Sequence, residues 1–123
     1  MPTPVAPWPV PPLSSGSSEA VTAYRAGVVA LVAGLGVATA FLDDALASDP
    51  HFHLARVALA VRLVLDGGPY EAPPVTGFLS RGERQHAEVV AAHFAGDRAR
   101  AVLLRREHLL EFPGDLLVVW LRP

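Results

Sequence analysis

The fold depends on residues 26–42, AGVVALVAGLGVATAFL, which carry no charged side chain over 17 positions. A run of this length reaches the lower limit of a membrane-spanning helix. Gly34-Leu35-Gly36 interrupts the run, and Asp43-Asp44 follows it directly. Two glycines two residues apart suit a tight turn between helices. We therefore predict a water-soluble helix–turn–helix, with a single-pass membrane protein through residues 26–42 as an alternative.

Apolar residues at helical spacing extend this pair of helices on both sides. Intervals of three and four predict a first helix over about residues 18–33, and a second follows over about residues 37–48. Asp49-Pro50 provides an N-cap and the residue favoured at the first helical position, so we expect a third helix from Pro50 to Leu65. This helix is apolar on most of its circumference and must be covered on both sides.

Caps and helix breakers divide the second half of the chain in the same way. Ser80 and Glu83 form a capping box before a fourth helix, Gly96 ends that helix, and Asp97 caps a fifth. The apolar run over residues 116–121 has no decisive period, and we assign it to a short helix. In the fifth helix four residues are expected to face inward: Val102, Leu103, Leu109 and Leu110.

Proline and glycine mark the segments outside these helices. Residues 1–17 hold six of the 12 prolines and few large apolar side chains, so we predict a disordered leader. An internal linker is expected over residues 67–79. The predicted fold class is all-α, with one domain over residues 18–123 that contains antiparallel helical hairpins and about six helices.

Composition excludes several kinds of chemistry. The chain has no cysteine for a disulfide or a thiolate metal site. All ten basic residues are arginine, so no lysine is present for a Schiff base or a phosphate-binding loop. The net charge of −2 provides no basic surface for nucleic acid or an anionic membrane. We therefore expect no nucleic-acid partner, no membrane partner and no cofactor.

Two sets of four residues share one spacing along the chain. The intervals are four, three and five in both sets, which lie 63 residues apart: Ala38, Leu42, Ala45 and Pro50, then Ala101, Arg105, His108 and Pro113. This spacing resembles the second helix of the tetratricopeptide repeat, where small residues let antiparallel helices approach closely. The large aromatic residue and the Leu-Gly pair of that repeat's first helix are absent.

A narrower resemblance covers about residues 24–115. Residues 45–50 (ALASDP), 81–86 (RGERQH) and 112–115 (FPGD) are similar to the tetratricopeptide repeat protein 38 family. Proteins of that family are much longer, so this chain resembles their N-terminal portion. The resemblance implies an α-solenoid of helical hairpins without established catalytic residues or an obligatory cofactor.

Histidine and arginine side chains are the candidate binding groups. His86 and His93 share one side of the fourth helix with Glu83. Glu83-x-x-His86 has the spacing of a di-metal ligand pair, but the chain contains only one such pair, so we predict no metal site. His51 and His53 are expected in solvent, and His108 against a neighbouring helix. The candidate groove, suited to an anionic peptide, consists of Arg81, Arg84, His86, His93 and Arg105.

These features predict a cytoplasmic, non-catalytic protein–protein interaction module, a scaffold or adaptor for a protein or peptide partner. The alternative is a small helical ligand-binding protein or accessory enzyme with a cavity lined by His86, His93 and Arg84. The apolar segment Leu116–Trp120 needs a cover. A second copy in a homodimer or a partner chain provides it, or the segment folds back over the third helix of its own chain.

Overall fold

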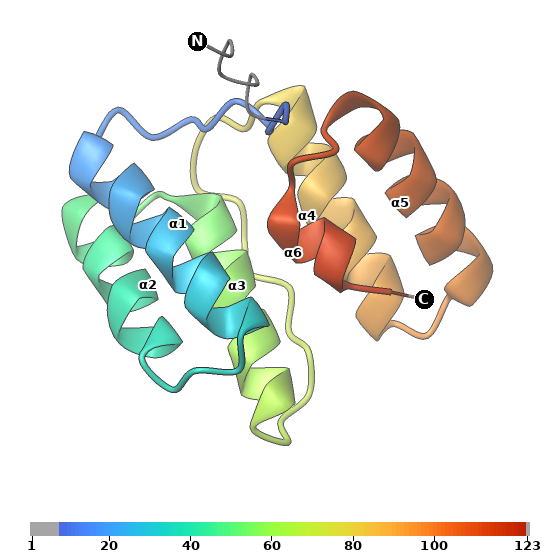
Figure 1. Cartoon of the computed structure of the whole chain (residues 1–123), viewed down its shortest axis with the longest axis horizontal. Coiled ribbons are helices and arrows are strands. Elements are labelled where there is room, and N and C mark those ends of the chain that lie inside the picture. The colour runs from blue at the N-terminus through green and yellow to red at the C-terminus, as the bar shows by residue number, and fades with distance from the viewer. Residues whose placement is uncertain (1–7, 123) are drawn as a thin grey trace, which may run out of the picture.

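Helices dominate the structure, a computed structural model that describes residues 8–122. Across these residues the chain forms six helices and no strand, so the all-α prediction is confirmed. The helices are α1 (Ser18–Val32), α2 (Ala38–Ser48), α3 (His53–Leu65), α4 (Arg81–Phe94), α5 (Arg98–Glu111) and α6 (Leu116–Trp120). Figure 1 shows two groups, α1 to α3 and α4 to α6, with α6 placed between α1 and α4.

The apolar run over residues 26–42 is divided between two helices. α1 ends at Val32, Gly34 turns the chain with a φ of +74°, and α2 begins at Ala38. The Leu35 N–H donates to the Ala30 carbonyl oxygen at 2.8 Å and closes the turn. The predicted helix–turn–helix is therefore present. Within residues 8–122, no helix combines the length and apolar character needed to cross a membrane.

Small residues allow close packing inside this hairpin. A Cβ atom added at Gly27 of α1 would lie 2.7 Å from Leu42 Cδ2 of α2, a distance too short for two carbon atoms. Ala38, Leu42 and Ala45 of α2 are fully buried between neighbouring helices. The first three positions of the repeat-like spacing thus lie in the core, where small side chains permit close helix–helix contact.

α3 begins at His53, three residues later than predicted. Residues 49–52 form a turn instead, because the Asp49 carboxylate accepts from the His51 N–H at 3.0 Å and the Asp49 carbonyl accepts from the Phe52 N–H at 3.1 Å. Phe52 packs against Tyr24 of α1, with ring centroids 5.0 Å apart. The expectation that His53 lies in solvent is wrong, since the turn carries it into the interior.

α5 buries a different face from the one predicted. Its buried residues are Ala101 and His108. Val102, Leu103 and Leu110, which were expected to face inward, are exposed, and Leu109 is half-buried. α5 packs chiefly against α4 and α6, so its buried stripe is narrow. The apolar residues on the rest of its circumference remain at the surface.

The described part of the predicted leader packs against the second helical group. The Pro9 carbonyl accepts from the Gly114 N–H at 2.8 Å, and the Pro12 carbonyl accepts from the Ser80 hydroxyl at 2.7 Å. Pro11 is buried. Residues 8–17 therefore differ from the expected disordered segment, because glycine at position 114 lets the leader backbone approach closely. Residues 1–7 of that prediction lie outside the described residues.

α6 is covered by its own chain. Leu117 and Leu121 belong to the core that also contains residues of α1 and α3, and Val118 is buried. Arg105 of α5 donates to the carbonyl oxygens of Val118 and Val119 at 3.1 and 2.9 Å. The cover comes chiefly from α1 rather than from α3 alone. Leu116 stays exposed and Trp120 half-buried, and a homodimer through Leu116–Trp120 stays a prediction.

Candidate functional site

The five predicted groove residues do not form one groove. Arg81 is exposed and pairs with Glu111, and Arg84 is exposed beside the segment that joins α3 to α4. His93 is half-buried against Phe94, whereas His86 is fully buried. Arg105 is engaged with the carbonyl oxygens of α6. The structure does not bring these five residues together, because α4 turns His86 toward the interior and Arg84 toward solvent.

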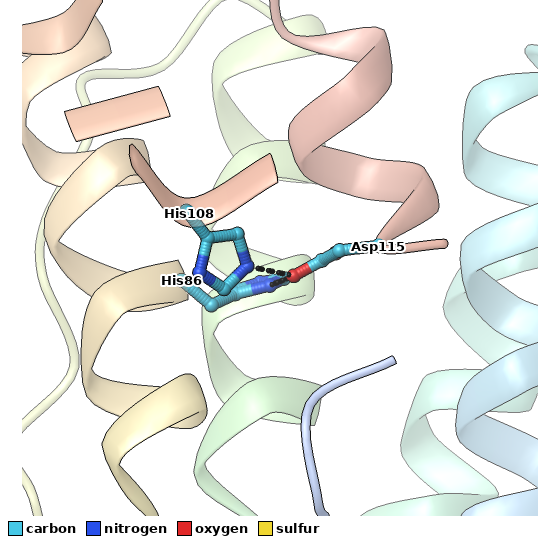
Figure 2. Close-up of side chains that lie close together, drawn as sticks. All are labelled: His86, His108 and Asp115. Atoms are coloured by element: carbon cyan, nitrogen blue, oxygen red, sulfur yellow. Dashed lines mark hydrogen bonds and ion pairs between the residues drawn. The ribbon is translucent and has the colours of Figure 1, made fainter. Parts of the chain in front are cut away.

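The structure instead brings together His86, His108 and Asp115 (Figure 2). Asp115 Oδ2 accepts hydrogen bonds from His86 Nδ1 and His108 Nε2, each at 2.7 Å. The two imidazole rings approach edge to face, with centroids 6.3 Å apart and planes at 79°. All three side chains are buried. One carboxylate oxygen therefore links α4, α5 and the start of α6.

Local structure explains how these three side chains meet. His86 lies in the middle of α4, after the Ser80–Glu83 capping box has fixed the start of that helix. His108 lies in the last turn of α5. Asp115 occupies the N-cap position of α6, where its carbonyl oxygen accepts from the Val119 N–H at 2.9 Å and its side chain is free to turn back toward the histidines.

The outer nitrogens of the two imidazoles have different surroundings. His108 Nδ1 lies 3.0 Å from Gln85 Oε1. His86 Nε2 is buried and has no hydrogen-bond partner among residues 8–122. Nδ1 of His86 donates to Asp115, so Nε2 is the nitrogen of this ring that is left without a partner in the described part of the chain.

Asp115 is held in its charged form. Burial acts to raise the pKa of Asp115, but the charge of His86 and the hydrogen bonds from His108 and His86 outweigh it and hold the pKa well below its usual value. Burial, followed by the charges of Asp115 and Glu83, raises the pKa of Tyr24 well above its usual value. The charges of Asp115 and Glu83 therefore add to burial in disfavouring a further negative charge at Tyr24.

A cavity of about 260 Å³ lies beside the cluster. Its lining is mainly apolar, from the leader, α1, α3 and the turn before α6. Three polar residues, Tyr24, Arg25 and Asp115, also line it. The predicted lining residues His86, His93 and Arg84 are absent from its walls, as far as the described residues define them. Water or a small ligand in this cavity therefore lies next to Asp115.

Sequence reasoning missed Asp115 as a site residue. It did place His108 against a neighbouring helix, and His108 is buried. The available signal was the repeat-like spacing, which places position 108 among the residues that pack between helices. The cluster can hold a proton or a cation, because a nitrogen of each imidazole lies next to the same carboxylate oxygen.

The fold and the cluster define an all-α protein of helical hairpins with a buried His–Asp–His cluster at their junction. Comparisons of the chain with family models, curated proteins and solved structures found no match. The functional assignment therefore depends on the geometry of the chain itself.

Acid is expected to destabilise the protein through His53. Burial lowers the pKa of His53, with a smaller opposing effect from Glu83. In the unfolded chain the His53 side chain takes up a proton near pH 6.5, whereas in the folded chain it stays neutral to a lower pH. This contribution to stability is therefore complete above about pH 6.5 and is lost as the pH falls through the folded pKa. Urea unfolding at pH 7 and at pH 5 measures this. Between the two pH values the free energy of unfolding should fall less for His53→Leu than for the natural chain.

The matched control is His51→Leu, because His51 is exposed two residues away. That variant should lose as much stability on acidification as the natural chain does. An equal loss in His53→Leu and His51→Leu would contradict the assignment of the pH dependence to His53.

Proposed function

We propose that this protein is a non-catalytic protein–protein interaction module, built as a tetratricopeptide-like array of helical hairpins and acting in the cytoplasm. The observation that carries the proposal is the apolar outer face of α5. Leu103 and Leu110 lie seven residues apart on one side of that helix and are 56% and 81% exposed. Val102, at 42% exposed, extends the same surface.

This face is unusual for a helix in a small protein. Single exposed leucines are common, but large apolar side chains that share one helix face mark a contact surface. α4 and α6 cover the opposite side of α5, so no element of residues 8–122 covers these side chains. We assign the surface to an amphipathic helix of a partner protein, with apolar residues at helical spacing and an acidic residue to meet Arg106.

Packing of the hairpins supports the array. The contact of Gly27 with Leu42 and the burial of Ala38 and Ala45 follow the principle of small residues at helix–helix contacts. In the second hairpin, Ala101 and His108 are buried at the corresponding positions. The resemblance to the tetratricopeptide repeat protein 38 family remains part of the proposal, and it is consistent with these two hairpins.

The test compares two pairs of exposed leucines in the full chain. Leu103→Glu with Leu110→Glu places charges on the α5 face, whereas Leu63→Glu with Leu65→Glu alters two exposed leucines at the end of α3. Affinity purification from the source cell should recover the same proteins with the natural chain and the α3 variant. Recovery with the α5 variant should fall at least tenfold, while circular dichroism shows equal helicity. Equal recovery with both variants would refute the role of this face.

A second candidate is a small helical ligand-binding protein. The specific observation in its favour is the cavity of about 260 Å³ with Asp115 on its wall, because Asp115 connects the cavity to two buried histidines. An apolar cavity with a few convergent polar groups is the usual form of a small-ligand site. This candidate does not require the outer face of α5.

A further inference from the structure

We propose that His86, His108 and Asp115 bind a divalent transition-metal ion that joins α4, α5 and the start of α6. The proposal is independent of partner binding at the α5 face. Imidazole nitrogen and carboxylate oxygen are ligands that Zn²⁺ and other first-row divalent ions accept.

The distances between the donor atoms are close to those of a metal site. One nitrogen of each histidine and one oxygen of Asp115 all lie within 4.8 Å of one another. Around a tetrahedral Zn²⁺, donor atoms at about 2.0–2.2 Å from the metal are about 3.3 Å apart. The two N···O distances of 2.7 Å in the hydrogen-bonded cluster need only a small opening to admit an ion.

Gln85 provides a second, independent observation. Its side-chain oxygen lies 3.0 Å from His108 Nδ1, on the side of the ring opposite Asp115. Metal-binding histidines usually donate their other N–H to an oxygen, which fixes the tautomer and the ring orientation. With Nδ1–H donated to Gln85, a metal ion that displaces the Nε2 proton of His108 binds the Nε2 lone pair in place of the hydrogen bond to Asp115. His86 binds through Nδ1 when its proton lies on Nε2, which has no other partner among the described residues.

Charge balance also favours a cation. Two carboxylates, Glu83 and Asp115, are buried, together with His53, His86 and His108, and no arginine among residues 8–122 is buried with them. A buried anion is costly unless it is paired or coordinates a metal. A divalent ion at Asp115 supplies the compensating charge and leaves both bound histidines neutral.

The site has an open side. Three protein ligands leave one position of a tetrahedral Zn²⁺ free, and Asp115 also borders the cavity of about 260 Å³, which has room for water. Because the three ligands lie on separate helices or at their ends, the ion acts as a cross-link within the second helical group.

The experiment titrates the natural full-length chain with Zn²⁺ and follows the imidazole nitrogens by ¹⁵N NMR. Nδ1 of His86 and Nε2 of His108 should shift and saturate at one equivalent, and the melting temperature should rise with Zn²⁺ concentration. Co²⁺ should give a d–d absorption spectrum with the same stoichiometry. This readout needs no variant, so it does not depend on whether a variant folds.

Two variants and a control locate the site. Asp115→Asn should weaken Zn²⁺ binding at least about 100-fold, and Gln85→Leu about 10–100-fold, as expected for the partner of a metal ligand. His51→Gln, which removes an exposed histidine, should bind as the natural chain does. Shifts confined to exposed histidines, or unchanged His86 and His108 signals at ten equivalents of Zn²⁺, would overturn the proposal. Neither result would affect partner binding at Leu103 and Leu110.

Discussion

Replacing Asp115 with alanine is expected to lower the free energy of unfolding by about 3–5 kcal/mol, the usual effect of removing one partner from a buried ion pair. The loss leaves His86 and His108, both fully buried, without the oxygen that accepts their hydrogen bonds. It also removes the one group that connects α4, α5 and α6 at a single point. Urea unfolding at pH 7 measures the change.

The matched control is Asp97→Ala, because Asp97 is also an aspartate at a helix N-cap. Its carboxylate accepts only from the exposed Arg100 N–H at 3.2 Å. Loss of such a cap costs about 1 kcal/mol. Equal destabilisation by the two substitutions would show that the buried cluster contributes no more stability than an exposed helix cap does.

Replacing Gly27 with leucine is expected to destabilise the protein by about 2–3 kcal/mol through overpacking of the first hairpin. The added Cβ would lie 2.7 and 2.8 Å from Leu42 Cδ2 and Cγ, and 3.3 Å from Phe41 Cβ. α1 and α2 must then separate. Leucine favours a helix more than glycine by about 0.8 kcal/mol, and this gain offsets only part of the cost. Thermal and urea unfolding measure the net effect.

Gly36→Leu is the control for this prediction. It introduces the same side chain in the turn between α1 and α2, where an added Cβ would meet no atom within 4 Å. Its effect on stability should be small. If Gly27→Leu were as stable as Gly36→Leu, the close approach of α1 and α2 at Gly27 would be wrong.

Helix ends were predictable because their signals are local. The Ser80–Glu83 capping box forms as expected, since its hydrogen bonds join residues only three apart. Gly34 and Gly96 adopt positive φ values of +74° and +77° at the ends of helices, where glycine carries no steric penalty. The capping aspartate of α5 is Asp97, as predicted.

The orientation of each helix was less predictable. In α5, apolar residues lie on more than one face, so the sequence pattern favoured Leu103 and Leu110 as the buried side chains although the structure buries Ala101 and His108. A small residue and a histidine fit there because α4 approaches closely and Asp115 supplies a hydrogen-bond acceptor. The sequence pattern of α5 alone predicts neither the close approach of α4 nor the acceptor on Asp115.

The sequence by itself determined the all-α class, the division of residues 26–42 between two helices and the positions of most caps. Each depends on interactions among residues within one or two helical turns. Only the tertiary structure brought His86, His108 and Asp115 together and packed the leader beside Gly114. The physical reason is sequence separation. His86 and Asp115 are 29 residues apart, and their contact depends on how three helices pack, which local propensity does not specify.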